Sequence, residues 1–103
     1  MAAMVVVIGT IRLAPGAVNR ARPAMAQMIA ASRAEDGCIA YSYAEDILDA
    51  GLVRVTELWR DQAALDRHFT LPHLTAWRAA WPDLGISDRA LRSYRIDSEL
   101  NAL

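Results

Sequence analysis

The two histidines, His68 and His73, are the side chains in this sequence best suited to moving a proton. An imidazole has an unperturbed pKa near neutrality, so it accepts and releases protons at ordinary cellular pH. If His68 shares the inner face of a helix with Ala64 and Leu65, it points into a pocket and can serve as a general base. The structural alternative is that His68 packs against a sheet while His73 caps the next helical segment.

A metal site is not predicted. The histidines are five positions apart with Pro72 between them, whereas an i, i+4 pair is needed to place two rings on one face of a helix. Cys38 is the single cysteine, so the chain offers neither a thiolate cluster for zinc nor an internal disulfide. We interpret Cys38 as a small buried residue.

Aromatic side chains are spaced so that they could enclose a flat ligand. Trp59 shares a predicted strand face with Glu57, and its ring fills either a pocket wall or the core. Tyr41 and Tyr43 share another strand face, where one hydroxyl is expected to reach the cavity unless packing or a subunit interface uses both. Glu57 is an unexpected charge that could pair with Arg33 or orient His68, and we favour a structural ion pair. The remaining predicted pocket residues are Phe69, His73, Trp77 and Trp81.

The elements that position these residues can be read from local patterns. Residues 4–13 are apolar at nearly every position, which indicates a central strand covered on both faces. Residues 17–35 follow a helical period and end before Gly37. Because Pro23 would cost about 3 kcal/mol in a helix interior, we expect the regular helix to start only at residues 19–22.

The second half of the chain predicts a hairpin, two helical segments and a last strand. Residues 38–46 alternate, with Ile39, Tyr41 and Tyr43 on one face, and pair with a strand over residues 52–59. The other expected features are an N-cap at Asp61, a helix interrupted at Pro72, a second segment over residues 73–81 that Pro82 stops, and a strand over residues 90–97.

This order, β-α-β-β-α-β, predicts one α+β domain over residues 1–103 with the ferredoxin-like topology and an antiparallel sheet. The helices of that topology cover one face of the sheet, whereas the first strand requires cover on both. A second copy of the chain would supply it, so we expect a homodimer.

Composition restricts the partners and the location. The 11 basic and 12 acidic residues leave a net charge of −1, and no basic block is present to neutralise phosphates, so nucleic acid is not an expected partner. The apolar residues 1–8 are too few to cross a bilayer, so no membrane association is expected. With its single cysteine, the chain is expected to be cytoplasmic.

Several short motifs together resemble the antibiotic-biosynthesis monooxygenase family over residues 4–97. These motifs are Pro15-Gly16 after the first strand, the helix-to-strand junction Ser32-Arg33-Ala34-Glu35-Asp36-Gly37-Cys38-Ile39-Ala40-Tyr41, Glu57-Leu58-Trp59-Arg60-Asp61, Ala64-Leu65-Asp66-Arg67-His68 and Leu71-Pro72-His73-Leu74. The resemblance implies a dimeric α/β-barrel with a pocket between sheet and helices in each subunit. It also implies that Trp59 lines this pocket.

The function implied by the resemblance is a cofactor-independent monooxygenase that oxidises a quinol or polycyclic phenol with O2. In this hypothesis His68 removes the phenolic proton, Trp59 and Tyr41 hold the ring, and Phe69 and the other aromatic residues exclude water.

Three alternatives stay open. Family members that degrade haem carry a histidine nine residues after a tryptophan, as His68 follows Trp59, although residues 4–13 lack those members' asparagine. Another branch suggests a non-oxidative isomerase that acts on a small phosphorylated signalling molecule. The last alternative is a module that binds a small ligand without turnover.

Overall fold

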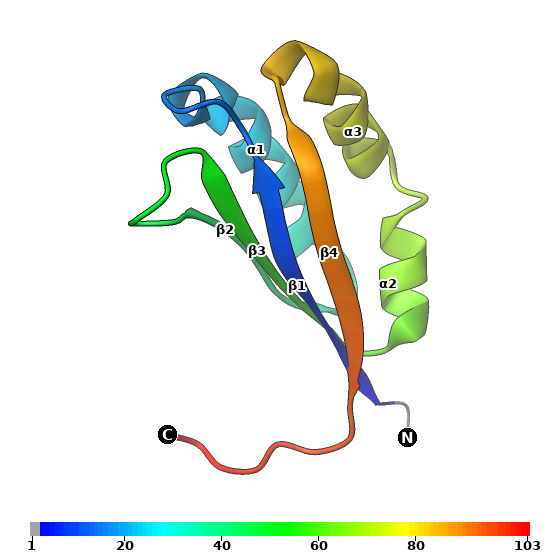
Figure 1. The fold of residues 1–103 in the computed structure, drawn as a ribbon. Helices are drawn as coiled ribbons and strands as arrows, with labels where there is room; N and C mark the ends of the chain where they lie inside the picture. Colours follow the sequence, from blue (N-terminus) through cyan, green and yellow to red (C-terminus); the bar gives the residue numbers. More distant parts are fainter. Residues whose placement is uncertain (1–2) are drawn as a thin grey trace.

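One antiparallel sheet with three helices packed on one of its faces makes up the computed structural model, which describes residues 3–103 (Figure 1). The strands are β1 (Met4–Arg12), β2 (Cys38–Glu45), β3 (Leu52–Trp59) and β4 (Ser87–Ile96), and their spatial order is β2-β3-β1-β4. The helices are α1 (Val18–Arg33), α2 (Gln62–His68) and α3 (Pro72–Leu84). The predicted α+β ferredoxin-like fold is therefore confirmed. Residues 1 and 2 of the predicted domain lie outside the described residues.

β1 is the central strand that its apolar pattern predicted, since it pairs antiparallel with β3 on one side and β4 on the other. Its side chains alternate between two environments. Val5, Val7 and Ile11 face the helices and are at most 6% exposed. Ile8 points to the opposite face and is 45% exposed. The described chain thus covers β1 on one face only.

α1 begins at Val18, one residue before the expected range of 19–22, so Pro23 lies inside the regular helix. The inner face of the helix is buried through residues such as Ala21, Met25 and Met28, and this packing stabilises the full helix. Pro23 lacks the N–H that would bond the carbonyl of Asn19. Both residues are exposed, so water can satisfy that carbonyl and the loss is tolerated.

β2 contains an irregularity that the alternation did not predict. The register with β3 shifts between Cys38 and Ala40. The shift turns Ile39 outward, where it is 53% exposed, whereas Tyr41 is 2% exposed. The predicted shared face of Ile39 with Tyr41 and Tyr43 is therefore wrong, because an extra residue on one strand reverses the alternation.

The α2–α3 region follows its capping signals except at Pro82. The Asp61 carboxylate accepts a hydrogen bond from the backbone N–H of Ala64 at 2.8 Å, as an N-cap does. Pro72 takes the first position of α3, where its missing N–H costs nothing. α3 continues past Pro82 and ends at Gly85, whose φ is 70°. The predicted stop is wrong because Pro82 lies within the last turn, where it removes a single hydrogen bond.

β4 begins earlier than predicted, since Ser87 already pairs with Arg12. None of the helices described over residues 3–103 is long and apolar enough to cross a membrane.

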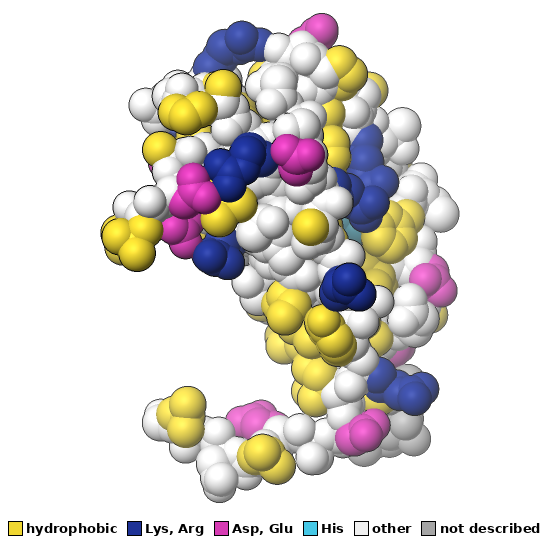
Figure 2. Space-filling view, in the orientation of Figure 1, with side chains coloured by type: hydrophobic (Ala, Val, Ile, Leu, Met, Phe, Trp, Pro, Cys, Tyr) yellow, Lys and Arg dark blue, Asp and Glu magenta, His cyan; other side chains and the backbone are white. Residues whose placement is uncertain are grey.

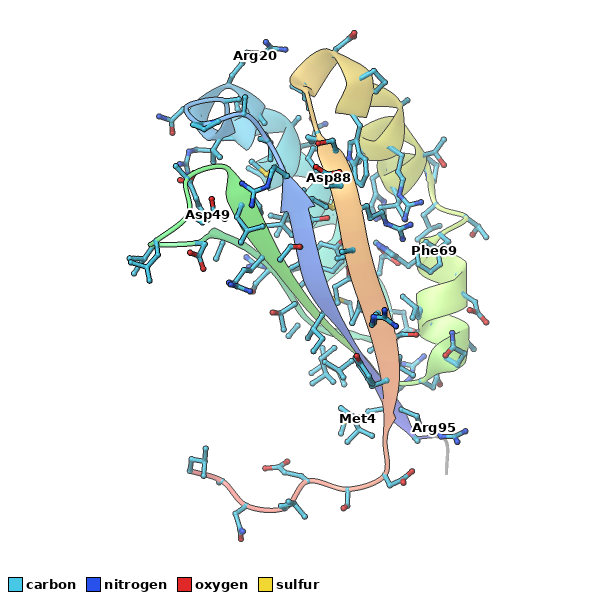
Figure 3. The ribbon with its side chains drawn as sticks, viewed as in Figure 1. Met4, Arg20, Asp49, Phe69, Asp88 and Arg95 are labelled. Atoms are coloured by element: carbon cyan, nitrogen blue, oxygen red, sulfur yellow. The ribbon has the colours of Figure 1, made fainter. Side chains whose placement is uncertain are left out.

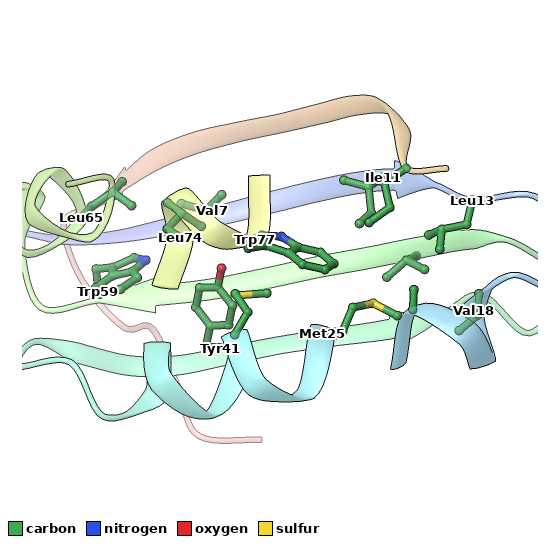
Figure 4. Packing of buried hydrophobic residues seen from close by; sticks show 14 of the residues in the cluster. Val7, Ile11, Leu13, Val18, Met25, Tyr41, Trp59, Leu65, Leu74 and Trp77 are labelled. Carbon is green, nitrogen blue, oxygen red and sulfur yellow. The ribbon is translucent and has the colours of Figure 1, made fainter. Parts of the chain in front are cut away.

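The core lies between the sheet and the helices, and its largest side chains come from different elements (Figure 4). Trp59 on β3, Tyr41 on β2 and Trp77 on α3 are large side chains that are at most 3% exposed. His68 at the end of α2 is buried beside them at 1% exposure. A polar ring in this position must have its nitrogens satisfied by protein groups.

Candidate active site

Three polar side chains from separate elements converge at one end of the core. Glu35 lies between α1 and β2, His68 ends α2 and His73 lies in the first turn of α3. Nδ1 of His68 and Nε2 of His73 lie 2.6 Å and 2.7 Å from the same atom, Oε2 of Glu35. The two rings do not share one helical face, as their spacing predicted. Residues 69–71 separate two helices, and each helix presents its own histidine to Glu35, which the spacing did not predict.

The carboxylate determines which nitrogen of each ring carries a proton. An ionised carboxylate only accepts hydrogen bonds, so Nδ1 of His68 and Nε2 of His73 both donate to Glu35. In a neutral His68 this leaves the lone pair on Nε2. That atom lies 3.4 Å from the hydroxyl of Tyr41, which is the donor in this contact.

Burial keeps both members of the Tyr41–His68 contact uncharged. Burial lowers the pKa of His68, although the hydrogen bond and charge of Glu35 act in the opposite direction. Burial also raises the pKa of Tyr41 well above its ordinary value, so the phenol keeps its proton. The arrangement is a neutral imidazole whose free lone pair faces a phenolic O–H, and such an imidazole can act as a general base.

Trp59 does not reach the cavity, contrary to the expectation drawn from the family. It is fully buried, and its Nε1–H donates to Oε1 of Glu57 at 3.0 Å. Its ring packs against His68 with 4.7 Å between ring centroids. Glu57 neither pairs with Arg33, which donates to the carbonyl of Tyr41, nor orients His68, which Glu35 does. Burial raises the pKa of Glu57.

A pocket opens beside His68 between the sheet and α3. Its free volume, including the part open to solvent, is about 330 Å³. Six residues that the sequence analysis proposed for the site line this pocket: Tyr41, Glu57, His68, Phe69, Trp77 and Trp81. His73 is not among the lining residues; it lies behind Glu35 and faces a separate hollow between α1 and α3. Phe69 stands 47% exposed where α2 and α3 meet (Figure 3).

Two arginines in the pocket wall were missed by the sequence reasoning. Arg78 from α3 and Arg89 from β4 both line the cavity. The guanidinium of Arg78 lies 5.6 Å from the ring centroid of Phe69 and 5.8 Å from that of Trp81. The two arginines and the carboxylate of Glu57 together give the pocket a formal charge of +1, which suits an anionic ligand. Arg78 could have been found as a charge one turn after Leu74 on the inner face of α3, whereas Arg89 lay outside the strand predicted over residues 90–97.

Glu35 was also missed as a site residue, although it carries a signal. An acidic residue at the C-terminal end of a helix opposes the helix dipole. A carboxylate placed there needs another partner, and the two histidines are its partners.

Comparison with known proteins determines the family of this fold and site. The sequence model of the antibiotic biosynthesis monooxygenase family matches residues 4–80. The chain belongs to this family. Its 37% identity to "Putative monooxygenase Rv0793" of Mycobacterium tuberculosis extends over 79 residues, 77% of each chain.

The chain is also similar to a second protein sequence and to a solved structure. The chain is 34% identical over 92 residues to the uncharacterized protein sll1783 of Synechocystis, which is 89% of this chain but only 63% of the length of that relative. A crystal structure of a "putative antibiotic biosynthesis monooxygenase" from Deinococcus radiodurans superposes with a TM-score of 0.88 at 27% identity, covering 96% of this chain and 98% of that one.

Proposed function

We propose that this member of the family is a cofactor-independent monooxygenase that oxidises a quinol or a polycyclic phenol with O2. The observation that carries the proposal is the Glu35–His68 hydrogen bond of 2.6 Å. It leaves the lone pair of His68 Nε2 free beside a pocket walled by aromatic rings. Family membership supports a small-molecule substrate and O2, and the geometry of this pair supports the specific chemistry.

In the first step the substrate's phenolic O–H gives its proton to Nε2 of His68. The substrate hydroxyl takes the place of the Tyr41 hydroxyl, whose 3.4 Å contact with Nε2 is long for a hydrogen bond. The imidazolium that forms is stabilised by Glu35, which is already bonded to Nδ1. General base catalysis of this kind contributes about 10²–10⁴-fold to a rate.

The phenolate that forms is held by the positive charge of the pocket. The two positive charges of Arg78 and Arg89 outnumber the one negative charge of Glu57 by one. A bound monoanion would therefore make the pocket neutral. Fixed charges in a site that excludes water stabilise an anion without reorganisation. Trp77 and Trp81 provide faces against which an aromatic ring can stack.

In the second step the electron-rich anion reduces O2. For a quinol the balance is one quinol and one O2 giving one hydroxyquinone and one water. One oxygen atom is bonded to a ring carbon as a new hydroxyl group, which takes the second phenolic proton. The other leaves as water with the proton from the base and the hydrogen displaced from that carbon. The substrate supplies the electrons, so the chain itself needs to provide only the base, the binding site and the exclusion of bulk water.

Substrate entry requires side chains to move. As the side chains stand, the enclosed part of the cavity is too small to admit an aromatic ring. Phe69 and Arg78, which stack on each other at the mouth, are the side chains that would swing aside. Closure over the bound ring then removes water from the reacting atoms.

We also propose that the active form is a cytoplasmic homodimer joined through the outer face of the sheet. Ile8 and Tyr94 are 45% and 49% exposed on that face, and Figure 2 shows apolar side chains gathered over the lower part of the sheet. A second copy would bury them and cover β1 on both sides. Size-exclusion chromatography with light scattering should report twice the mass of 11.3 kDa, and a monomer would contradict the dimer.

A second candidate function gains support from the two arginines. An isomerase acting on a small phosphorylated signalling molecule needs cations around the phosphate, and Arg78 and Arg89 line the pocket. Its turnover would persist without O2, which separates it from an oxygenase. The haem alternative would require the same displacement of the Tyr41 hydroxyl from His68 Nε2, and residues 4–13 lack the asparagine of the haem-degrading members. A ligand-binding module would bind phenols tightly but give no product.

The decisive experiment is oxygen uptake with a panel of hydroquinones and polycyclic phenols in chelator-treated buffer. Wild type is compared with His68→Ala and with Asp66→Asn, a surface carboxylate of α2 that contacts Gln62. Uptake should scale with enzyme, survive chelation, persist in Asp66→Asn and fall about 10²–10⁴-fold in His68→Ala. Uptake at the spontaneous rate for every substrate would overturn the proposal.

A further inference from the structure

Glu35 is a buried carboxylate without a lysine or arginine partner. Within 4.0 Å, its ionic partners in the part of the chain that the structure describes are His68 and His73 alone. Its side chain is 4% exposed, and its second oxygen, Oε1, is buried with no hydrogen-bond partner. Buried carboxylates are normally paired with a cation or bound to a metal, because an uncompensated buried charge is costly.

The surrounding atoms form a set of metal ligands. One atom each from Glu35, His68 and His73 can be chosen so that all three lie within 4.8 Å of one another. Two imidazole nitrogens and one carboxylate oxygen are the ligands of many catalytic zinc sites and of non-haem iron sites. His73 is 21% exposed, so an ion can reach the cluster from solvent without unfolding the core.

We propose that Glu35, His68 and His73 form a binding site for a divalent first-row transition-metal ion such as Zn²⁺. The three protein ligands would leave one tetrahedral position for water. Zinc binds nitrogen and oxygen at about 2.0–2.2 Å, so its ligand atoms stand roughly 3.3 Å apart. The present N···O distances of 2.6 and 2.7 Å are hydrogen bonds. Loading therefore requires both distances to widen by several tenths of an ångström. The partly exposed His73 ring can make this shift on its side, and the Glu35 carboxylate must turn away from His68 on the other.

With Glu35 ionised and both imidazoles neutral, binding would move two protons without releasing either. In His68 the proton on Nδ1 moves to Nε2, and in His73 the proton on Nε2 moves to Nδ1. The metal then occupies the nitrogens that now donate to Glu35. His68 would carry an N–H where the general base needs a lone pair. This consequence rests on the proposed function: the bound ion inhibits proton abstraction instead of assisting it.

The binding test uses Co²⁺ as a visible-absorption probe, followed by displacement with Zn²⁺ in competition with a chromophoric chelator. Wild type should bind one ion per chain. Glu35→Gln and His73→Ala should each weaken binding at least about 100-fold, with folding checked by circular dichroism. Asp36→Asn, the neighbouring carboxylate bound by Arg60, and Cys38→Ser should bind as wild type does. No binding by wild type, or undiminished binding by both site variants, would overturn the proposal.

An activity assay separates this inference from the proposed function. Zn²⁺ should lower quinol-dependent oxygen uptake by wild type and a chelator should restore it, whereas His73→Ala should resist Zn²⁺ at the same concentration. If Co²⁺ binds as expected but no quinol is oxidised, the metal site stands and the oxygenase proposal fails. If oxygen uptake is present but Co²⁺ does not bind, the oxygenase stands and the metal site fails.

Discussion

Glu35 and His68 lie 33 positions apart in the sequence, yet Oε2 of the carboxylate lies 2.6 Å from Nδ1 of the imidazole. The contact joins the segment after α1 to the last residue of α2, and it specifies which ring nitrogen carries the proton. A base held in one tautomer by a buried partner needs no reorientation when its substrate arrives.

Replacing the carboxylate should impair catalysis more than binding. Glu35→Gln keeps the shape of the side chain but removes the charge that stabilises the His68 imidazolium. We expect kcat for quinol oxidation to fall about 100-fold with little change in KM. Asp36→Asn is the matched control, since Asp36 is 77% exposed and lies outside the cluster. An unchanged kcat in Glu35→Gln would show that the carboxylate is only structural.

Removing the indole N–H of Trp59 should lower stability. Trp59→Phe preserves an aromatic ring against His68 but leaves the buried Glu57 oxygen without its donor at 3.0 Å. An unsatisfied buried group costs about 1–3 kcal/mol, so Tm should fall by at least about 4 °C in a chain of this size. When Trp59→Phe is made in a Glu57→Leu background, no carboxylate remains to lose its donor. The part of the Tm decrease that comes from the missing N–H should then disappear. A Tm equal to that of wild type would contradict this account of the Trp59–Glu57 bond.

Neutralising Glu57 should stabilise the protein in a pH-dependent way. Burial raises the pKa of Glu57 in the folded state above its unfolded value. As pH rises between these two values, the unfolded chain releases the proton and the folded chain keeps it, so wild type loses stability. Glu57→Gln lacks this loss and can still accept from Trp59. Its Tm advantage should be absent near pH 3–4 and grow as pH rises beyond the ordinary carboxyl range of about 4.3. Parallel Tm curves for the two proteins from pH 3 to pH 8 would refute the prediction.

Removing the charge of Arg78 should weaken binding of an anionic substrate. Arg78→Met keeps an unbranched side chain against Phe69 and Trp81 but loses the cation stacked on them. We expect KM for a phenolic substrate to rise about 5–10-fold, from a loss on the order of 1 kcal/mol. Arg22→Met on the exposed side of α1, where Arg22 donates to the side chain of Asn19, should leave KM unchanged. Equal KM values for the two variants would exclude an electrostatic role for Arg78.

The order of the elements could be predicted from the sequence because its signals are local. The apolar run of β1, the helical period of α1 and the Asp61 cap each depend on neighbours within a few positions. The β-α-β-β-α-β order then left few topologies, and the observed sheet has the predicted one. The errors at Ile39 and Pro82 arose where a register shift and tertiary packing overrode a local rule.

The site could be predicted only in part. Strand alternation placed Tyr41 and Glu57 on the inner face, and helical spacing placed Trp77 near them. The partners of these groups were not predictable, because a periodic pattern specifies a face and not what lies across from it. Glu35 meets both histidines only because α1, α2 and α3 end or begin at the same place. The sequence alone therefore determined which elements form and which residues face inward. Tertiary packing decided which side chains meet, because contacts between distant segments depend on how whole elements dock.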